Sequence, residues 1–217
     1  MKVKKLSEIL KENPTYKPSW KVSKDLTRLY HPKFGEIERI VICDDAGNPL
    51  WDQYQISEGP LTPEGKRIPG SVVLPYYKAG GKYFLGLLYN ERPIPLDPCT
   101  GKKGIISLEV PRGFALSGEI PTETAKRELG AETGKVIKKL HYLGKININT
   151  TFYETWIENY AAEIFKNKVS KFRPDATEKI LRCEFYSTKE VKEMIKNDKI
   201  LCGISKASIL EFFLHFE

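Results

Sequence analysis

Residues 113–135 read GFALSGEIPTETAKRELGAETGK, a loop sequence followed by a helical one. The spacing predicts a helix that begins near Pro121 and ends at Gly134, because proline suits the first helical turn and glycine the position after the last one. Glu128 and Glu132 are four residues apart and therefore lie together on one face of that helix. Two neighbouring carboxylates repel each other, and a divalent cation such as magnesium relieves the repulsion.

The same segment resembles the Nudix box, G-x5-E-x7-R-E-U-x-E-E-x-G-U with U an apolar residue. Seven of the nine constrained positions match: Gly113, Glu119, Arg127, Glu128, Leu129, Glu132 and Gly134. The preceding residues, Glu109-Val-Pro-Arg-Gly113, are similar to the E-x-P-x-G motif of family members that act on ADP-ribose and nucleotide sugars. On these motifs the chain resembles the Nudix hydrolases, and in particular the ADP-ribose and nucleotide-sugar pyrophosphatases.

The resemblance implies an α+β fold, the Nudix-type α/β/α sandwich with a mixed sheet, over about residues 71–216. Ahead of it, two strand patterns joined by the turn sequence Asp45-Ala-Gly-Asn-Pro49 predict a β-hairpin. A loop rich in glycine and proline, residues 59–70, then marks a boundary. We therefore expect an N-terminal extension with a β-hairpin over residues 1–60 and a Nudix hydrolase domain over residues 65–217.

Periodicity and turn residues predict the individual elements. Ala79-Gly80-Gly81 is expected to join two core strands as a tight turn, since glycine readily adopts positive φ angles. Residues 93–104 are expected to be irregular, and a short helical pattern surrounds Leu6. The expected strands are 36–43, 50–56, 71–77, 82–89, 105–110, 139–146, 155–165 and 179–186, and the further helices are 189–196 and 205–216.

Carried over to this sequence, the resemblance implies a metal site on the helix after the loop. Glu128 and Glu132 correspond to catalytic side chains that bind Mg²⁺ or Mn²⁺, and the backbone carbonyl of Arg112 corresponds to a further ligand. In such enzymes the ion neutralises phosphate charge and lowers the pKa of the attacking water. Three other box residues support the helix and orient its carboxylates: Gly113, Glu119 and Arg127.

Two positions depart from the box: Ala131 replaces the first glutamate of its E-E pair, and Lys135 replaces an apolar residue. The missing carboxylate removes one ligand and one negative charge, so a second or third ion should bind more weakly. Gly130 also costs the helix about 1 kcal/mol relative to alanine. Two interpretations stay open: an active enzyme, and a catalytically impaired nucleotide-binding module that acts as a sensor or scaffold.

Candidate site residues also lie outside the box. Glu154 stands at the end of a polar loop and is preferred over Glu158 as the catalytic base, because a loop residue can reach into a cleft. Arg92 and Arg112 could bind substrate phosphate through paired hydrogen bonds, and the alternative for both is a surface ion pair. Glu109, from the motif before the box, joins them in the predicted substrate site.

Two aromatic residues follow the same polar loop. Tyr153 could stack on a nucleotide base, whereas the alternating pattern around Trp156 favours a place in the core. The three histidines show no metal-ligand spacing and are expected to be structural or surface residues: His31, His141 and His215.

The 217 residues include 35 basic and 28 acidic side chains, a net charge of +7 that suits a phosphate-bearing partner. The lysines are spread along the chain without a nucleic-acid-binding motif, so nucleic acid is not an expected partner. No apolar run approaches the roughly 20 residues that span a bilayer, and no signal-peptide pattern opens the chain. We expect a cytoplasmic protein without membrane contact, whose four cysteines form no Cys-x-x-Cys pair and are reduced.

The sequence thus predicts metal-dependent hydrolysis of a phosphoanhydride bond in a small nucleoside diphosphate derivative, similar to ADP-ribose or a nucleotide sugar. Water would attack one phosphorus, and a nucleoside monophosphate and a sugar phosphate would leave. The N-terminal hairpin resembles in placement the small β extension through which ADP-ribose members form dimers, so a homodimer is expected. RNA-end processing, which uses the same box, is a third hypothesis.

Overall fold

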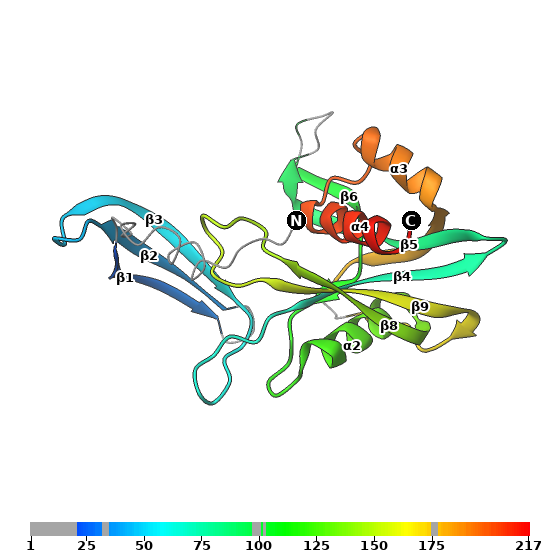
Figure 1. The fold of residues 1–217 in the computed structure, drawn as a ribbon, viewed down its shortest axis with the longest axis horizontal. Coiled ribbons are helices and arrows are strands. Elements are labelled where there is room, and N and C mark those ends of the chain that lie inside the picture. The colour runs from blue at the N-terminus through cyan, green and yellow to red at the C-terminus, as the bar shows by residue number, and fades with distance from the viewer. Residues whose placement is uncertain (1–20, 32–34, 97–100, 102, 175–177) are drawn as a thin grey trace, which may run out of the picture.

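The chain forms a three-stranded sheet on one side and a larger body built around a second sheet (Figure 1). The helical pattern expected around Leu6 lies outside the described residues. The computed structural model describes residues 21–31, 35–96, 101, 103–174 and 178–217.

The first sheet has the strand order β1-β2-β3, with β1 at Lys21–His31, β2 at Gly35–Cys43 and β3 at Pro49–Glu58. Both pairings are antiparallel. The expected N-terminal hairpin is confirmed as β2 and β3. Strand β1 was not predicted, because polar residues interrupt its apolar alternation and a register shift between Lys24 and Arg28 breaks its pairing with β2.

The second sheet has the order β10-β5-β4-β9-β8, and two short strands join it, β6 beside β5 and β7 beside β4. The pairing of β4 with β9 is parallel and the others are antiparallel, which confirms the mixed sheet. The strands are β4 at Ser71–Ala79, β5 at Lys82–Leu96, β6 at Lys103–Glu109, β7 at Arg112–Gly113, β8 at Lys135–Ile146, β9 at Ile157–Val169 and β10 at Ile180–Ser187.

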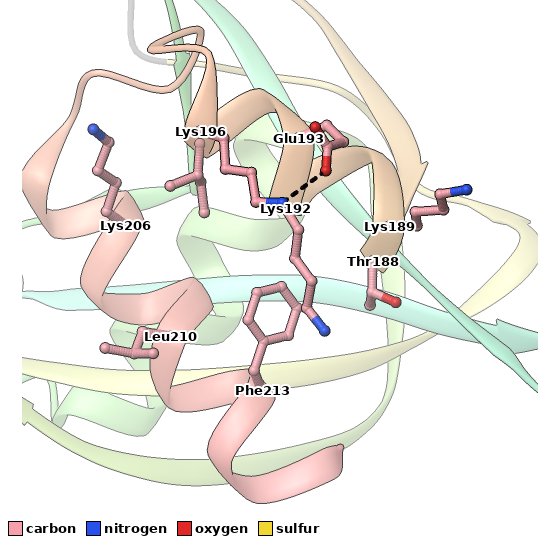
Figure 2. A pocket seen from close by; sticks show the side chains of 9 residues that line it. Thr188, Lys189, Lys192, Glu193, Lys196, Lys206, Leu210 and Phe213 are labelled. Carbon is pink, nitrogen blue, oxygen red and sulfur yellow. Dashed lines mark hydrogen bonds and ion pairs between the residues drawn. The ribbon is translucent and has the colours of Figure 1, made fainter.

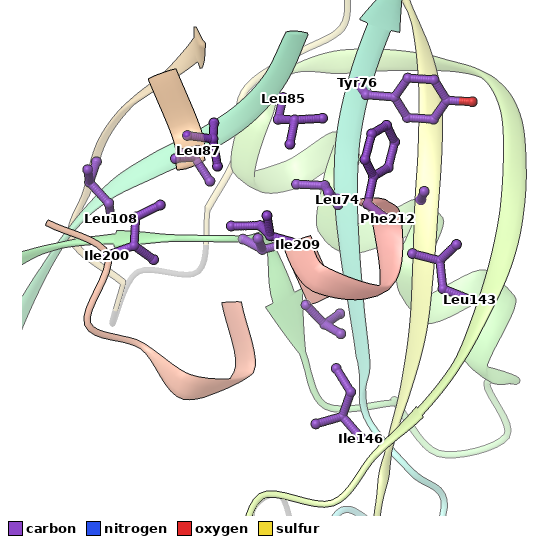
Figure 3. Packing of buried hydrophobic residues seen from close by; sticks show 14 residues of the cluster. Leu74, Tyr76, Leu85, Leu87, Leu108, Leu143, Ile146, Ile200, Ile209 and Phe212 are labelled. Atoms are coloured by element: carbon purple, nitrogen blue, oxygen red, sulfur yellow. The ribbon is translucent and has the colours of Figure 1, made fainter. Parts of the chain in front are cut away.

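Helices cover both faces of this sheet, as the alternating side chains of β4 show. Leu74 points to one face and packs in the cluster that contains Phe212 of α4 (Figure 3). Val73 points to the other face and packs with Leu129 of α2. The α/β/α sandwich is therefore confirmed, with α2 at Pro121–Thr133 on one side and α3 at Thr188–Lys196 and α4 at Gly203–Phe216 on the other. In the described part of the chain, no helix is both long enough and apolar enough to cross a membrane.

Several element bounds differ from the expectation. Gly80 and Gly81 form the predicted tight turn, with φ angles of 56° and 76°. The stretch expected to be irregular is instead partly ordered, because β5 continues to Leu96 and β6 starts at Lys103. Strand β8 starts at Lys135, soon after the helix, and not at residue 139 as expected. The lysines near its beginning interrupt the apolar alternation, so the sequence pattern did not indicate a strand there.

Candidate functional site

The helix that carries the predicted metal ligands begins and ends as the sequence indicates. Pro121 occupies its first turn, and the side chain of Glu123 accepts a hydrogen bond from the backbone N–H of Ile120 at 3.2 Å. At the other end Gly134 has a φ of 62°, the left-handed conformation that closes a helix. The helix follows β7 after a loop at residues 114–120, and its inner face packs on β4, the central strand of the sheet.

Gly113 allows the carboxylate of Glu128 to lie against the backbone of the preceding loop. A Cβ at position 113 would lie 1.9 Å from Oε1 of Glu128 and 2.3 Å from its Cδ, far closer than atoms can approach. Nη1 of Arg127 donates a 2.6 Å hydrogen bond to the same Oε1. Glu128 is 8% exposed and is therefore fixed by a glycine on one side and a guanidinium on the other.

Glu132 lies behind Glu128 and is buried, with 2% of its surface exposed. The backbone N–H of Arg112 donates to its Oε2 at 3.0 Å. Burial raises the pKa of Glu132 to about 9, and the negative charges of Glu178 and Glu128 add to the rise. The pKa of Glu128 is also raised, chiefly by burial. The nearby arginines therefore do not offset the cost of burying these two negative charges.

Glu119 and Arg127 form a second layer behind the pair. Nε and Nη2 of Arg127 donate to the two carboxylate oxygens of Glu119, each at 2.8 Å, and Nη2 also donates to the backbone oxygen of Phe114. These hydrogen bonds hold the pKa of Glu119 at about 2. Because Arg127 also contacts Glu128, it links Glu119 to the carboxylate pair.

Arg92 and Arg112 converge on Glu109. Arg92 donates to both oxygens of Glu109, most closely from Nη2 at 2.6 Å, and Nη2 of Arg112 lies 3.1 Å from Oε2. Burial alone would raise the pKa of Glu109, but the hydrogen bonds from Arg92 and the charge of Arg112 lower it overall. Glu109 is 3% exposed, so it is buried behind the two arginines and orients them.

These groups surround a cavity of about 820 Å³. Five of the predicted catalytic, metal-binding, phosphate-binding and box residues line it: Arg92, Arg112, Gly113, Arg127 and Glu128. Tyr153, the candidate for stacking on a base, lines it as well. Glu132 and Glu109 lie directly behind this lining. Glu154 is not brought to the cavity, because its Oε2 accepts a 2.5 Å hydrogen bond from Ser57 of β3. The cavity thus joins a carboxylate pair to several guanidinium groups, which suits a phosphate substrate with a bound cation.

Three charged lining residues were not predicted from the sequence: Glu58, Arg173 and Glu178. Glu58 ends β3, and the other two come from the connection between β9 and β10. The backbone N–H of Arg173 donates to the carbonyl of Ala131 at 2.9 Å, which brings this connection against the box helix. No motif marks these positions, since only the tertiary fold brings them to the cavity.

The predicted core position of Trp156 is wrong. Trp156 is 42% exposed and lines the cavity together with Tyr153. Its Nε1 donates to Glu158 at 2.7 Å, and the ammonium of Lys145 lies 4.1 Å from its ring centroid. These polar partners satisfy the indole at the surface, so the alternating pattern did not lead to burial.

The geometry fits a divalent cation in a limited way. Among the described residues, no three His, Cys, Asp or Glu side chains converge closely enough to hold a metal ion by themselves. Glu128 and Glu132 nevertheless present buried oxygens whose charged forms are disfavoured, and a cation beside them would offset that cost. Backbone carbonyl, water and phosphate oxygens would have to complete an octahedral shell.

A second cavity, of about 610 Å³, lies between α3 and α4 and is shown in Figure 2. Lysine side chains line it above Leu210 and Phe213. Three of these lysines have carboxylate partners, because Lys192 contacts Glu217, Lys196 lies 3.1 Å from Glu193, and Lys206 lies 3.7 Å from Asp198. This groove has neither the carboxylate pair nor the arginines of the larger cavity, which remains the candidate site.

Comparison with known proteins relates the chain to a sequence family and to a solved structure. The family model described as NUDIX domain matches residues 69–202. A solved structure described as "Crystal structure of ADP compounds hydrolase" superposes with a TM-score of 0.59, covering 91% of this chain and 92% of that chain. The two sequences are 14% identical, so this likeness shows a shared fold. No curated protein matches the sequence.

Proposed function

Since the chain belongs to the Nudix family, we propose that it hydrolyses a phosphoanhydride bond in a nucleoside diphosphate derivative. We favour a small substrate similar to ADP-ribose or a nucleotide sugar. Three observations support this class: the E-x-P-x-G motif before the box, the arginine-lined cavity, and the fold shared with an ADP compounds hydrolase.

The buried pair Glu128 and Glu132, beside a cavity lined by arginines, is the observation that carries the proposal. These two side chains, with the backbone carbonyl of Arg112, would hold one Mg²⁺ or Mn²⁺ ion. When bound, the ion supplies charge neutralisation and a more acidic water. Arg127 keeps Glu128 in place, while Arg92 and Arg112 bind phosphate oxygens.

The proton of the attacking water needs an acceptor, and we assign this role to Glu178. Glu178 lines the cavity, and its charge raises the pKa of both Glu128 and Glu132, so it lies within electrostatic reach of the pair. Glu154, the candidate taken from the sequence, is turned toward β3. We expect Glu178→Gln to lower kcat by about 10²-fold or more, because general bases contribute 10²–10⁴-fold. Glu154→Gln should leave kcat within about twofold, and equal losses in both variants would contradict the assignment.

The direct test of the function is a variant of the carboxylate pair. Glu132→Gln should abolish metal-dependent turnover of ADP-ribose, since the amide cannot supply a charged ligand, while circular dichroism shows an intact fold. A chelator should have the same effect on the wild-type protein. Turnover that survives both treatments would contradict the metal assignment.

A catalytically impaired nucleotide-binding module is the second candidate, and Ala131 is the observation that favours it. The box glutamate absent at this position leaves the cavity with one carboxylate fewer for metal ions. Such a module would bind ADP and gain thermal stability with magnesium present, without forming product. A product assay beside a thermal-shift assay separates the two functions.

The assembly and domain layout that we propose follow from the N-terminal sheet. Residues 1–60 form the extension and residues 65–217 the catalytic domain. Trp51 and Tyr54 of β3 are 51% and 57% exposed and lie on opposite faces of the N-terminal sheet. The face that carries Trp51 is the one that we propose as the interface of a homodimer. Light scattering should give twice the chain mass, and Trp51→Glu should give the monomer.

We place this enzyme in the cytoplasm, where its free thiols would stay reduced.

A further inference from the structure

The loop at residues 147–156 forms one wall of the substrate cavity and is held by its own asparagines. Nδ2 of Asn147 donates to the backbone oxygens of Tyr153 and Thr155, both at 3.0 Å. The backbone N–H groups of Phe152 and Tyr153 donate to the carbonyl of Asn149. The loop therefore has a defined backbone from which its side chains project.

Strand β3 of the N-terminal sheet pairs with this loop. The backbone N–H of Ile56 donates to the oxygen of Phe152 at 2.6 Å, and the N–H of Glu154 donates to the oxygen of Ile56 at 3.0 Å. The N–H of Glu58 donates to Oγ1 of Thr155 at 3.2 Å. The loop thus lies along the end of β3 and forms a single parallel bridge with it, between Ile56 and Tyr153.

The two sides of the loop have different partners. Tyr153, Thr155 and Trp156 line the cavity, whereas Glu154 between them contacts β3. Its partner Ser57 is 1% exposed and donates to Oε2 at 2.5 Å, a hydrogen bond strengthened by the carboxylate charge. The extension, which precedes the residues that match the family model, therefore touches the back of the cavity wall.

The strand that carries Ser57 is itself anchored. Ser57 lies opposite Glu36 in the pairing of β2 with β3, and Glu36 forms a largely buried ion pair with Arg67. Nη1 of Arg67 also donates to the carbonyl of Gly59 at 3.0 Å. These contacts tie the end of β3 to the connection that leads into β4, so Ser57 offers the loop a fixed hydrogen-bond donor.

We propose that Ser57 and Glu154 are positioning residues that set the shape of the substrate cavity. Their hydrogen bond fixes the loop so that the rings of Tyr153 and Trp156 form a wall for the nucleoside part of the substrate. The N-terminal sheet is thereby a component of the substrate site within one chain. The inference rests on the proposed function for its substrate class, but not for the geometry of the loop.

The test measures binding and turnover separately. Ser57→Ala and Glu154→Ala should each raise the KM for ADP-ribose about tenfold, which corresponds to about 1.4 kcal/mol, and leave kcat within about twofold. The Kd of ADP, measured by calorimetry without metal, should rise by the same factor. The double variant should match the single variants, because both changes remove one interaction.

Two controls separate positioning from general destabilisation. Asp52→Asn changes a carboxylate on the same strand that bonds Arg39 and not the loop, so KM and the Kd of ADP should stay unchanged. The fluorescence of Trp156, identified by its loss in Trp156→Phe, should shift to the red in Ser57→Ala. An unchanged Kd and emission spectrum in both Ser57→Ala and Glu154→Ala would overturn the proposal.

The outcomes also distinguish this proposal from the proposed function. A wild-type protein that binds ADP without hydrolysing ADP-ribose, and binds it more weakly in Ser57→Ala, would refute the enzyme and support the positioning role. Normal turnover with an unchanged KM in Ser57→Ala would support the enzyme and overturn the positioning role. A wild-type protein that neither binds ADP nor hydrolyses ADP-ribose would overturn both.

Discussion

Gly113→Ala tests whether metal binding and turnover depend on the close approach of Glu128 to the loop backbone. The added Cβ would lie 1.9 Å from Oε1 of Glu128, and real Cβ contacts stay beyond 3.0 Å. The carboxylate must therefore retreat by about 1 Å, which also disturbs its 2.6 Å hydrogen bond with Arg127. A displacement of about 1 Å can cost 10²-fold in rate, so we expect kcat/KM to fall by about that factor.

The assay combines turnover of ADP-ribose with calorimetric Mg²⁺ binding, and circular dichroism reports the fold. The strain falls on the far end of one side chain, so Gly113→Ala should remain folded while its metal affinity decreases. Gly130→Ala is the matched control, because a Cβ there meets nothing within 4 Å. That variant should gain up to about 1 kcal/mol of stability and keep its activity. Wild-type metal affinity and kcat/KM in Gly113→Ala would refute the reasoning.

Three further predictions concern the box helix. Glu119→Gln should lower the melting temperature at pH 7. The difference in melting temperature from wild type should shrink as the pH falls from about 4.5 toward 2. Arg127 holds the pKa of Glu119 at about 2, and the stabilising charge is lost when Glu119 is protonated. A difference that persists at pH 2 would contradict this origin. Ala131→Glu should raise Mg²⁺ affinity about tenfold in calorimetry by adding a carboxylate to the cavity wall, and an unchanged affinity would show that this position does not reach the ion. Gly134→Ala should cost about 1 kcal/mol in urea unfolding, since alanine is strained at a φ of 62°; an unchanged midpoint would contradict it.

The box helix was predictable because its signals are local. Pro121 and Gly134 mark its ends, and the spacing of Glu128 and Glu132 places both carboxylates on one side. Leu129 follows the same helical period into the core. Arg92 and Arg112 were each a candidate for binding phosphate on the sequence alone, but only the tertiary fold brings both of them onto Glu109.

The rest of the site depends on contacts between distant segments. Arg173 and Glu178 reach the cavity only because the connection between β9 and β10 folds back onto the box helix. Glu154 was expected in a cleft because it follows a loop, yet the pairing of that loop with β3 turns the carboxylate away. Trp156 lies in the loop before β9, which starts at Ile157, so the alternation of the strand does not extend to this ring. Its polar partners then hold it at the surface.

We propose that this chain is a metal-dependent hydrolase of nucleoside diphosphate derivatives. The most direct measurement is chromatography of products from ADP-ribose, nucleotide sugars, dinucleoside polyphosphates and nucleoside triphosphates, each with Mg²⁺, Mn²⁺ or chelator. We predict that ADP-ribose or a nucleotide sugar is cleaved to a nucleoside monophosphate and a sugar phosphate only when metal is present. Survival of every compound, with ADP still raising the melting temperature, would contradict the enzyme and identify a nucleotide-binding module.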